Sequence, residues 1–317
     1  MTPALILTAI APVMAILALG FWAGKQGIFN PEQARGLSTF ALHFALPAAL
    51  FLSMAQLDHR LLLQQGPMMV IMLIGYSAYF LIAYLFLRAL KLPALRATLL
   101  GYTVSSTAVP IYGLTVLVPI FGTQIGTGVV GLAALVTNLA QVSVVIFMLQ
   151  EAAASAAGND GGKPGFVRVI GDAVMNPLVW CPMAGTLFSA FGLHLPPMIN
   201  TALNPLGVCA AGVAIFACGL ILAGYKLHMT SRTVFFGTLA SLIVQPLLFF
   251  AVIKLWGIGT MMAKATFVAA AMPTGTPSAL FAQQYKDSEA EIASIMLLTT
   301  IAMLVTLPAS LFLSGYL

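Results

Sequence analysis

Two short stretches place prolines among hydroxyl and glycine residues inside segments that are otherwise apolar. Their polar and helix-breaking members are Thr103, Ser105, Ser106, Thr107 and Pro110 in TVSSTAVPIYG, and Pro273, Thr274, Gly275, Thr276, Pro277 and Ser278 in AMPTGTPSA. Proline removes a backbone donor and clashes with the carbonyl one turn back, so each stretch is expected to break a helix. The half-helix beyond each break would begin with unpaired N–H groups and about half a positive charge. The chemistry that this pattern predicts is noncovalent binding of a small anion without a cationic side chain.

Among the amide side chains in apolar segments, four have a predicted role. Asn138 and Gln141 are three residues apart and share a helix face, so they either line a cavity or hold two helices together; we favour the cavity. Asn176 and Gln245 each precede a proline, and we expect them to satisfy backbone groups that the proline frees.

His43 and Tyr112 are the remaining candidates for the site. His43 either changes charge near neutral pH in contact with a substrate, or is a neutral imidazole bonded across a helix pair. Tyr112, two residues after Pro110, either walls the site or packs. The sequence contains no Walker loop, no metal-ligand cluster and no nucleophile–base set within its apolar segments, so we expect no enzyme activity, no bound metal and no cofactor.

The composition identifies the class of protein that positions these residues. Of the 317 residues, 61% are hydrophobic and 7% are charged, and the mean hydropathy is +1.03, far from the roughly 25% charge of soluble domains. The apolar stretches run to about 20 residues, the length of bilayer-spanning helices. We therefore expect an all-α integral membrane protein in contact with lipid. The net charge of +5 belongs to loops, so we expect no nucleic-acid partner.

Hydropathy and helix breakers predict ten membrane spans. They are residues 3–24, 34–55, 67–88, 97–121, 126–150, 169–190, 201–223, 233–254, 262–284 and 292–314. A polar, Gly-rich cytoplasmic linker over residues 151–168 separates a first repeat, residues 1–150, from a second, residues 169–317.

Charge distribution predicts the orientation. With both termini outside the cell, ten Lys and Arg residues fall in inner loops and three in outer loops. Five spans per half is an odd number, so the second half enters the membrane with opposite orientation, and similar halves would form inverted repeats. ATLLGYTVSSTAVP begins at residue 97 and ATFVAAAMPTGTP at residue 265, and both run from Ala-Thr to a proline within the span.

Several motifs resemble the auxin efflux carrier family in its short bacterial form. They are LPAALF in the second span, the proline-centred fourth span, NPLV at the start of the sixth, AMPTGTPSALFAQQY in the ninth and the ending TLPASLFLSGYL. The resemblance implies a scaffold of helices 1, 2, 6 and 7 and a moving transport domain of helices 3–5 and 8–10. The broken helices 4 and 9 cross at the substrate site. Such carriers move small organic anions by an elevator-like motion and often dimerise through their scaffolds.

The leading hypothesis is a secondary transporter of a small mono- or dicarboxylate such as malonate in the cell inner membrane. If transport is coupled to protons, the proton would be carried by His43 or by the substrate. If it is coupled to sodium, the ion could be coordinated by backbone carbonyls and by the hydroxyls of Thr274 and Thr276. The alternative is a sodium-coupled symporter of larger amphipathic anions that resembles the bile acid carriers. A channel or a non-transporting receptor is a further alternative. The identity of the carboxylate, the direction of transport, the coupling ion and the oligomeric state stay open.

Overall fold

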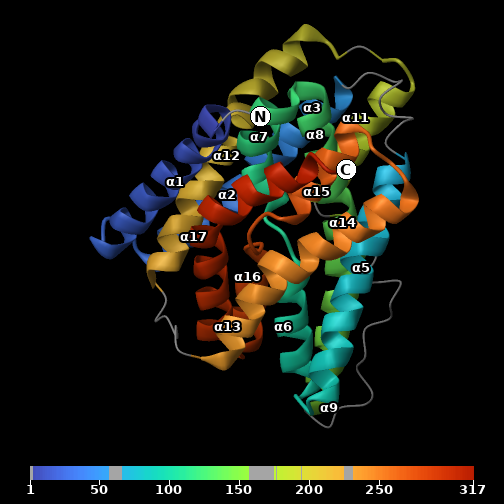
Figure 1. Cartoon of the computed structure of the whole chain (residues 1–317). Helices are drawn as coiled ribbons and strands as arrows, with labels where there is room; N and C mark the ends of the chain where they lie inside the picture. Colours follow the sequence, from blue (N-terminus) through green and yellow to red (C-terminus); the bar gives the residue numbers. More distant parts are fainter. Residues whose placement is uncertain (1–2, 57–65, 157–174, 176, 194, 225–230) are drawn as a thin grey trace.

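The structure is a computed structural model that describes residues 3–56, 66–156, 175, 177–193, 195–224 and 231–317 (Figure 1). The described part is helical and contains no β-strand, which confirms the all-α class. In chain order the helices are α1 (Pro3–Lys25), α2 (Pro31–Phe40), η1 (Ala41–Ala45), α3 (Leu46–Ala55), α5 (Gly66–Ala89), α6 (Ala94–Ser105), α7 (Val109–Phe121), α8 (Thr123–Leu135), η2 (Val136–Val142), α9 (Ser143–Ala156), α11 (Pro177–Ala190), α12 (Pro197–Gly224), α13 (Arg232–Leu239), η3 (Ala240–Val244), α14 (Gln245–Trp256), α15 (Met261–Ala270), α16 (Pro277–Tyr285) and α17 (Glu289–Ser314).

Helices cover most of the described parts of the predicted spans, and seven helical segments among the described residues are long and apolar enough to cross a membrane. Residues 177–190 of the sixth span form α11, while residues 169–174 and Asn176 lie outside the described residues. The predicted linker begins later than residue 151, because α9 continues to Ala156; residues 157–168 also lie outside the described part. The chain is thus a multi-pass membrane protein.

Three segments within the long helices have π-helical hydrogen bonding: η1, η2 and η3. η1 and η3 are each followed by a helix with proline at its second residue, Pro47 in α3 and Pro246 in α14. A proline cannot complete the regular ladder, and the wider turn before it accommodates the clash. η2 contains no proline and carries both Asn138 and Gln141. Such π turns recur at functional sites.

Two groups of helices pack closely within themselves, and α7 and α8 contact members of both groups. In the first, α12 packs against α1, α2 and α3, and α11 packs against α3. In the second, α5 packs against α6 and α14, α6 against α9, and α17 against α13, α15 and α16. The ends of α6, α9 and α13 extend below those of α1 and α12 in Figure 1.

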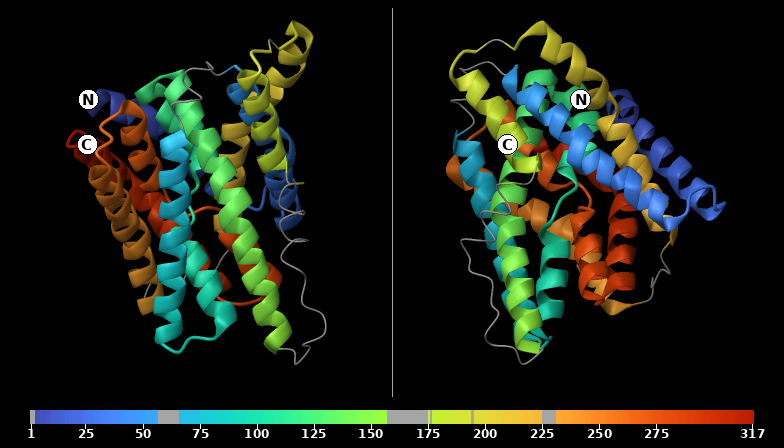
Figure 2. Two further views of the ribbon diagram at one scale, coloured as in Figure 1. Left: turned by 90° about the vertical axis from the view of Figure 1, so that its right-hand side faces the viewer. Right: turned by 180° about the vertical axis from the view of Figure 1, so that it is seen from behind.

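Glycines allow close contact between α1 and α12, which lie side by side in Figure 2. A Cβ at Gly20 would lie 2.3 Å from the backbone oxygen of Phe216, and one at Gly219 would lie 2.4 Å from that of Leu17. Backbone atoms of a packed helix cannot move aside for an added Cβ in the way that a flexible side chain can. Small residues at these positions therefore bring the two backbones together, as in other membrane helix pairs.

We expect Gly219→Ala to destabilise the protein by about 2–3 kcal/mol, because the added methyl group forces α1 and α12 apart. The change should appear as a fall of at least about 5 °C in the unfolding temperature of the detergent-purified protein. Gly212→Ala is the matched control, because Gly212 lies on the same helix and has nothing within 4 Å of an added Cβ. Equal unfolding temperatures for the two variants would refute the close packing.

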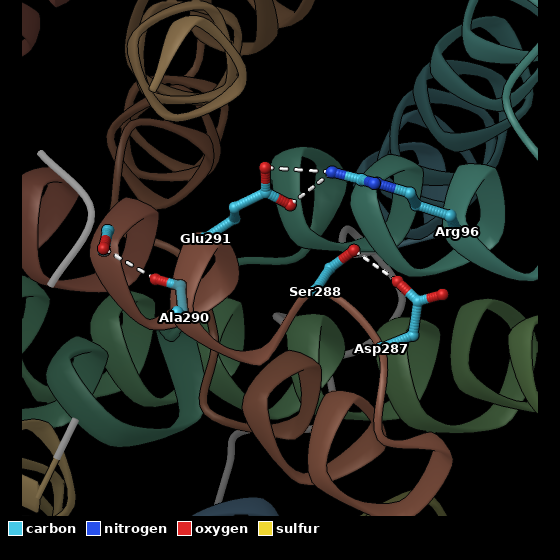
Figure 3. A network of polar contacts seen from close by, with 6 residues as sticks. Arg96, Asp287, Ser288, Ala290 and Glu291 are labelled. Atoms are coloured by element: carbon cyan, nitrogen blue, oxygen red, sulfur yellow. Dashed lines mark hydrogen bonds and ion pairs between the residues drawn. The ribbon is translucent and has the colours of Figure 1, made fainter. Parts of the chain in front are cut away.

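An ion pair joins the two halves of the sequence within the second group of helices. The guanidinium Nη2 of Arg96 on α6 lies 2.7 Å and 2.9 Å from the two carboxylate oxygens of Glu291 on α17 (Figure 3). Ser288, just before α17, donates its hydroxyl to the carboxylate of Asp287. These contacts tie the start of α6 to the start of α17, so the two elements are held together at one end of the group.

Candidate functional site

The two proline-rich stretches interrupt helices and touch each other. Residues 106–108 separate α6 from α7, and residues 271–276 separate α15 from α16. We call them the first and second breaks. The backbone N–H of Ala108 donates a hydrogen bond of 2.8 Å to the carbonyl of Pro273. The two breaks, more than 160 residues apart in the sequence, are thus joined directly by their backbones.

A small cavity lies where the breaks meet, and we call it the break cavity. Its volume is about 30 Å³. It is lined by Leu42, Tyr102, Ser106, Thr107, Ala108, Pro110, Ile111, Thr137, Asn138, Val142, Leu178, Gly275, Thr276 and Pro277. A buried water needs a cavity of roughly 10–15 Å³, so the break cavity has room for about two waters or for the two oxygens of one carboxylate.

The polar groups around the break cavity favour an anion. Among the described residues, the backbone N–H groups of Thr107, Gly275 and Thr276 have no hydrogen-bond acceptor. The hydroxyl of Thr276 is also buried without a partner in the described part, in a residue that is 5% exposed. Pro110 and Pro277, in the first turns of α7 and α16, line the same cavity, which places the positive ends of both helix dipoles there. No Lys or Arg is among the described lining residues.

Amides from two other helices satisfy the backbone at the end of α6. The carbonyl of Ser105 accepts hydrogen bonds from Nε2 of Gln141 at 3.4 Å and from Nε2 of Gln245 at 3.0 Å. Gln141 also donates to the Ser105 hydroxyl at 2.9 Å, and neither glutamine lines the break cavity. Gln141 therefore joins helices, the alternative that the sequence left open. Gln245 donates to a carbonyl of a helix far away in the sequence. We expected it to satisfy a backbone group freed by the neighbouring proline in its own helix.

Hydroxyl groups hold the second break. The N–H of Thr274 donates to the hydroxyl of Thr299 at 3.3 Å, and the Thr274 hydroxyl lies 3.3 Å from that of Ser241. Ser278 donates its hydroxyl to the Gly275 carbonyl at 2.7 Å. Thr274 and Ser278, both predicted site residues, thus stabilise the break and do not line the cavity.

Tyr76 and Ser241, which contact the breaks, were not predicted from the sequence, because their partners are far away along the chain. Thr107 donates its hydroxyl to the Tyr76 hydroxyl at 3.2 Å, which fixes the first break against α5. Nothing in the apolar surroundings of Tyr76 or Ser241 marks them as partners of the breaks. A hydroxyl within an apolar span was the one available signal.

Three further predicted site residues do not line the break cavity. The Thr103 hydroxyl bonds to the Leu99 carbonyl within α6 at 2.7 Å. The Tyr112 hydroxyl donates to the sulfur of Cys218 on α12 at 3.6 Å, so this side chain packs between α7 and α12. His43 is exposed, with its Nδ1 3.2 Å from the carbonyl of Thr39. A role for these side chains in binding stays a prediction.

Two larger cavities lie elsewhere among the described helices. One of about 410 Å³ is formed between α3, α7, α8 and α12, and includes Ser53, Gln56, Gln124 and Thr127; we call it the α3–α8 cavity. The other, of about 200 Å³, is formed between α1, α2, α12, α16 and α17; we call it the α2–α16 cavity. Thr276 lines both the α2–α16 cavity and the break cavity. Among the described residues, the break cavity therefore shares a lining residue with the α2–α16 cavity but not with the α3–α8 cavity.

Comparison with known proteins agrees with this architecture. Residues 5–311 match the family model described as membrane transport protein. The chain is 24% identical to the uncharacterized transporter YfdV of Escherichia coli (strain K12), with 96% of each chain covered. It is 24% identical to the protein named “Putative malonate transporter” of Rhizobium meliloti (strain 1021), covering 96% of this chain and 94% of that one. It is 21% identical to auxin efflux carrier component 8 of Arabidopsis thaliana, covering 96% and 95%. The chain therefore belongs to the membrane transport protein family, the family of the auxin efflux carriers, and is a transporter and not an enzyme.

Proposed function

We propose that this protein is a secondary transporter of a small organic anion, a mono- or dicarboxylate such as malonate. The observation that carries the proposal is the break cavity, which is lined by residues whose backbone N–H groups, and in Thr276 also the hydroxyl, have no partner among the described residues. No acidic residue is among its described lining residues. An anion there would accept hydrogen bonds from groups that otherwise go unsatisfied, at a cost of several kcal/mol each in a membrane. The name of the Rhizobium meliloti relative supports malonate as the first substrate to try.

The size of the break cavity favours small substrates. At about 30 Å³ it holds one carboxylate group, and the rest of the anion would extend past Thr276 into the α2–α16 cavity of about 200 Å³. A large amphipathic anion of the bile-acid type would need far more apolar space around the breaks. We therefore place the small carboxylate ahead of the bile-acid-like alternative.

Alternating access would come from movement of one helix group against the other. We propose that all ten predicted spans cross the membrane as two inverted repeats, with broken helices α6–α7 and α15–α16. The packing of α1, α2, α3, α11 and α12 into one group supports a scaffold of the first, second, sixth and seventh spans. The remaining helices would form the transport domain of an elevator. Both termini would face outward from the cell inner membrane, and two chains would pair through their scaffolds.

Uptake into liposomes tests the proposed function. The purified protein is reconstituted, and uptake of labelled malonate is followed with no gradient, with a sodium gradient and with a proton gradient. Saturable uptake above that of empty liposomes is the expected result, and its dependence on the gradients identifies the coupling ion. Uptake that never saturates, with conductance far above carrier rates, would instead indicate a channel. No uptake of any of a panel of mono- and dicarboxylates would overturn the proposal.

A further inference from the structure

Part of the wall of the α2–α16 cavity lies where α1 ends and α2 begins. Its wall contains Gly24 near the end of α1, Asn30 and Pro31 at the start of α2, and Gly224 at the end of α12. Its inner wall contains Thr276 and Ala279 of the second break and α16. The cavity thus lies between the start of α2 and Thr276, which also lines the break cavity.

Arg35 is the one charged side chain among the described residues that line this cavity. It lies on α2, is exposed, and has no carboxylate within 4 Å in the described part of the chain. By contrast, Arg96 is paired with Glu291 at 2.7 Å. Arg35 is therefore an unpaired cation beside a cavity that leads to a neutral anion-binding site.

The surroundings make that charge effective. An exposed charge in bulk water is screened within about 8–10 Å at physiological salt, but a cavity with low-dielectric walls concentrates the field of a charge at its mouth. Ser38 lies about one turn further along α2 and lines the same cavity. An anion between Arg35 and Thr276 would thus pass a guanidinium, a hydroxyl and then the unpaired donors of the breaks. The α3–α8 cavity has no Lys or Arg among its described lining residues.

We propose that Arg35 forms an access subsite for the substrate carboxylate, which draws small anions into the α2–α16 cavity before they reach the break cavity. This inference rests on the proposed function for the identity of the ligand, but the electrostatic effect of Arg35 does not. Arg35 contacts the anion directly and transiently, whereas the breaks hold it during movement of the transport domain. Recruitment by a side chain would thus be separate from binding by backbone groups.

The charge of thiol reagents reports the effect of Arg35 without any substrate. Ser38→Cys is introduced into a chain whose Cys181, Cys209 and Cys218 are replaced by alanine, and its reaction rates with a negatively and a positively charged thiosulfonate reagent are compared. We expect the ratio of the anionic to the cationic rate to be about fivefold higher with Arg35 than with Arg35→Gln. Arg35→Lys should restore most of the ratio, and added salt should reduce it.

Ser53→Cys is the matched control, because Ser53 lines the α3–α8 cavity. Arg35→Gln should leave its rate ratio unchanged. A ratio at Ser38→Cys that changes by less than twofold on Arg35→Gln would overturn the proposal. So would a cysteine at position 38 that reacts with neither reagent, because the cavity would then be closed to anions.

Transport supplies the second readout. In reconstituted protein, Arg35→Gln should lower the kcat/KM of malonate uptake about fivefold, Arg35→Lys should recover it, and Lys25→Gln should not change it. Lys25 is a suitable control because its ammonium lies over the Phe21 ring at 5.5 Å and does not line the cavity. Absence of uptake by the unmodified protein counts against the proposed function alone, since the thiol measurement still decides the role of Arg35. Wild-type kcat/KM in Arg35→Gln would overturn the subsite.

Discussion

Thr276→Val is expected to lower the kcat/KM of carboxylate uptake by about ten- to a hundredfold. The substitution keeps the shape of the side chain and removes the buried hydroxyl that has no partner among the described residues. A hydrogen bond to a charged group contributes about 1.5–3 kcal/mol, which corresponds to this range. Since no internal hydrogen bond is lost, the unfolding temperature should stay near that of the unmodified protein. Initial rates of malonate uptake into liposomes provide the measurement.

Thr266→Val is the control for this prediction. Thr266 on α15 is fully buried, and its hydroxyl also lacks a partner in the described part of the chain, but it does not line the break cavity. It therefore undergoes the same chemical change at a site where no anion is proposed to bind. Equal uptake by the two variants, whether normal or reduced, would argue against Thr276 as a ligand of the substrate.

Gly275→Val is expected to reduce uptake to below about one hundredth of the unmodified rate. A Cβ at Gly275 would lie 3.2 Å from the backbone oxygen of Thr107 and 3.4 Å from Cδ of Pro277. The first contact is tighter than ordinary packing, and the two further methyl groups of valine would take up space in a cavity of about 30 Å³. The breaks would be pushed apart and the carboxylate excluded.

Gly275→Ala should have a smaller effect, because it adds the Cβ without the methyl groups that fill the cavity. Gly212→Val tests whether any glycine-to-valine change in this membrane protein abolishes uptake, since nothing lies within 4 Å of an added Cβ at Gly212. Size-exclusion chromatography and the unfolding temperature establish that each variant is folded. Normal uptake by a folded Gly275→Val protein would show that the substrate does not use the break cavity.

The helices and their interruptions were predictable because their causes are local in the sequence. Apolar length defined the third and seventh spans, where the predictions 67–88 and 201–223 compare with Gly66–Ala89 and Pro197–Gly224. Pro110 and Pro277 marked the breaks because proline cannot donate to the helical ladder. Both effects act within a few residues and need no knowledge of the rest of the fold.

The partners of the breaks were not predictable, because they depend on how helices pack. Gln141 and Gln245 both reach the Ser105 carbonyl from helices far away in the sequence. His43 illustrates a second limit: it lies in the π-helical segment η1, where the wider turn changes the direction of the following side chains. A regular period of 3.6 residues per turn cannot place such a side chain. The sequence therefore identified the backbone of the site better than its supporting side chains.

A structure determined with bound malonate tests the central claim most directly. We expect carboxylate density in the break cavity, within hydrogen-bond distance of the backbone N–H groups of Thr107, Gly275 and Thr276 and of the Thr276 hydroxyl. The remainder of the anion should point toward the α2–α16 cavity. Density for the carboxylate in the α3–α8 cavity, with the break cavity empty or filled by water, would contradict the assignment of the two breaks as the anion site.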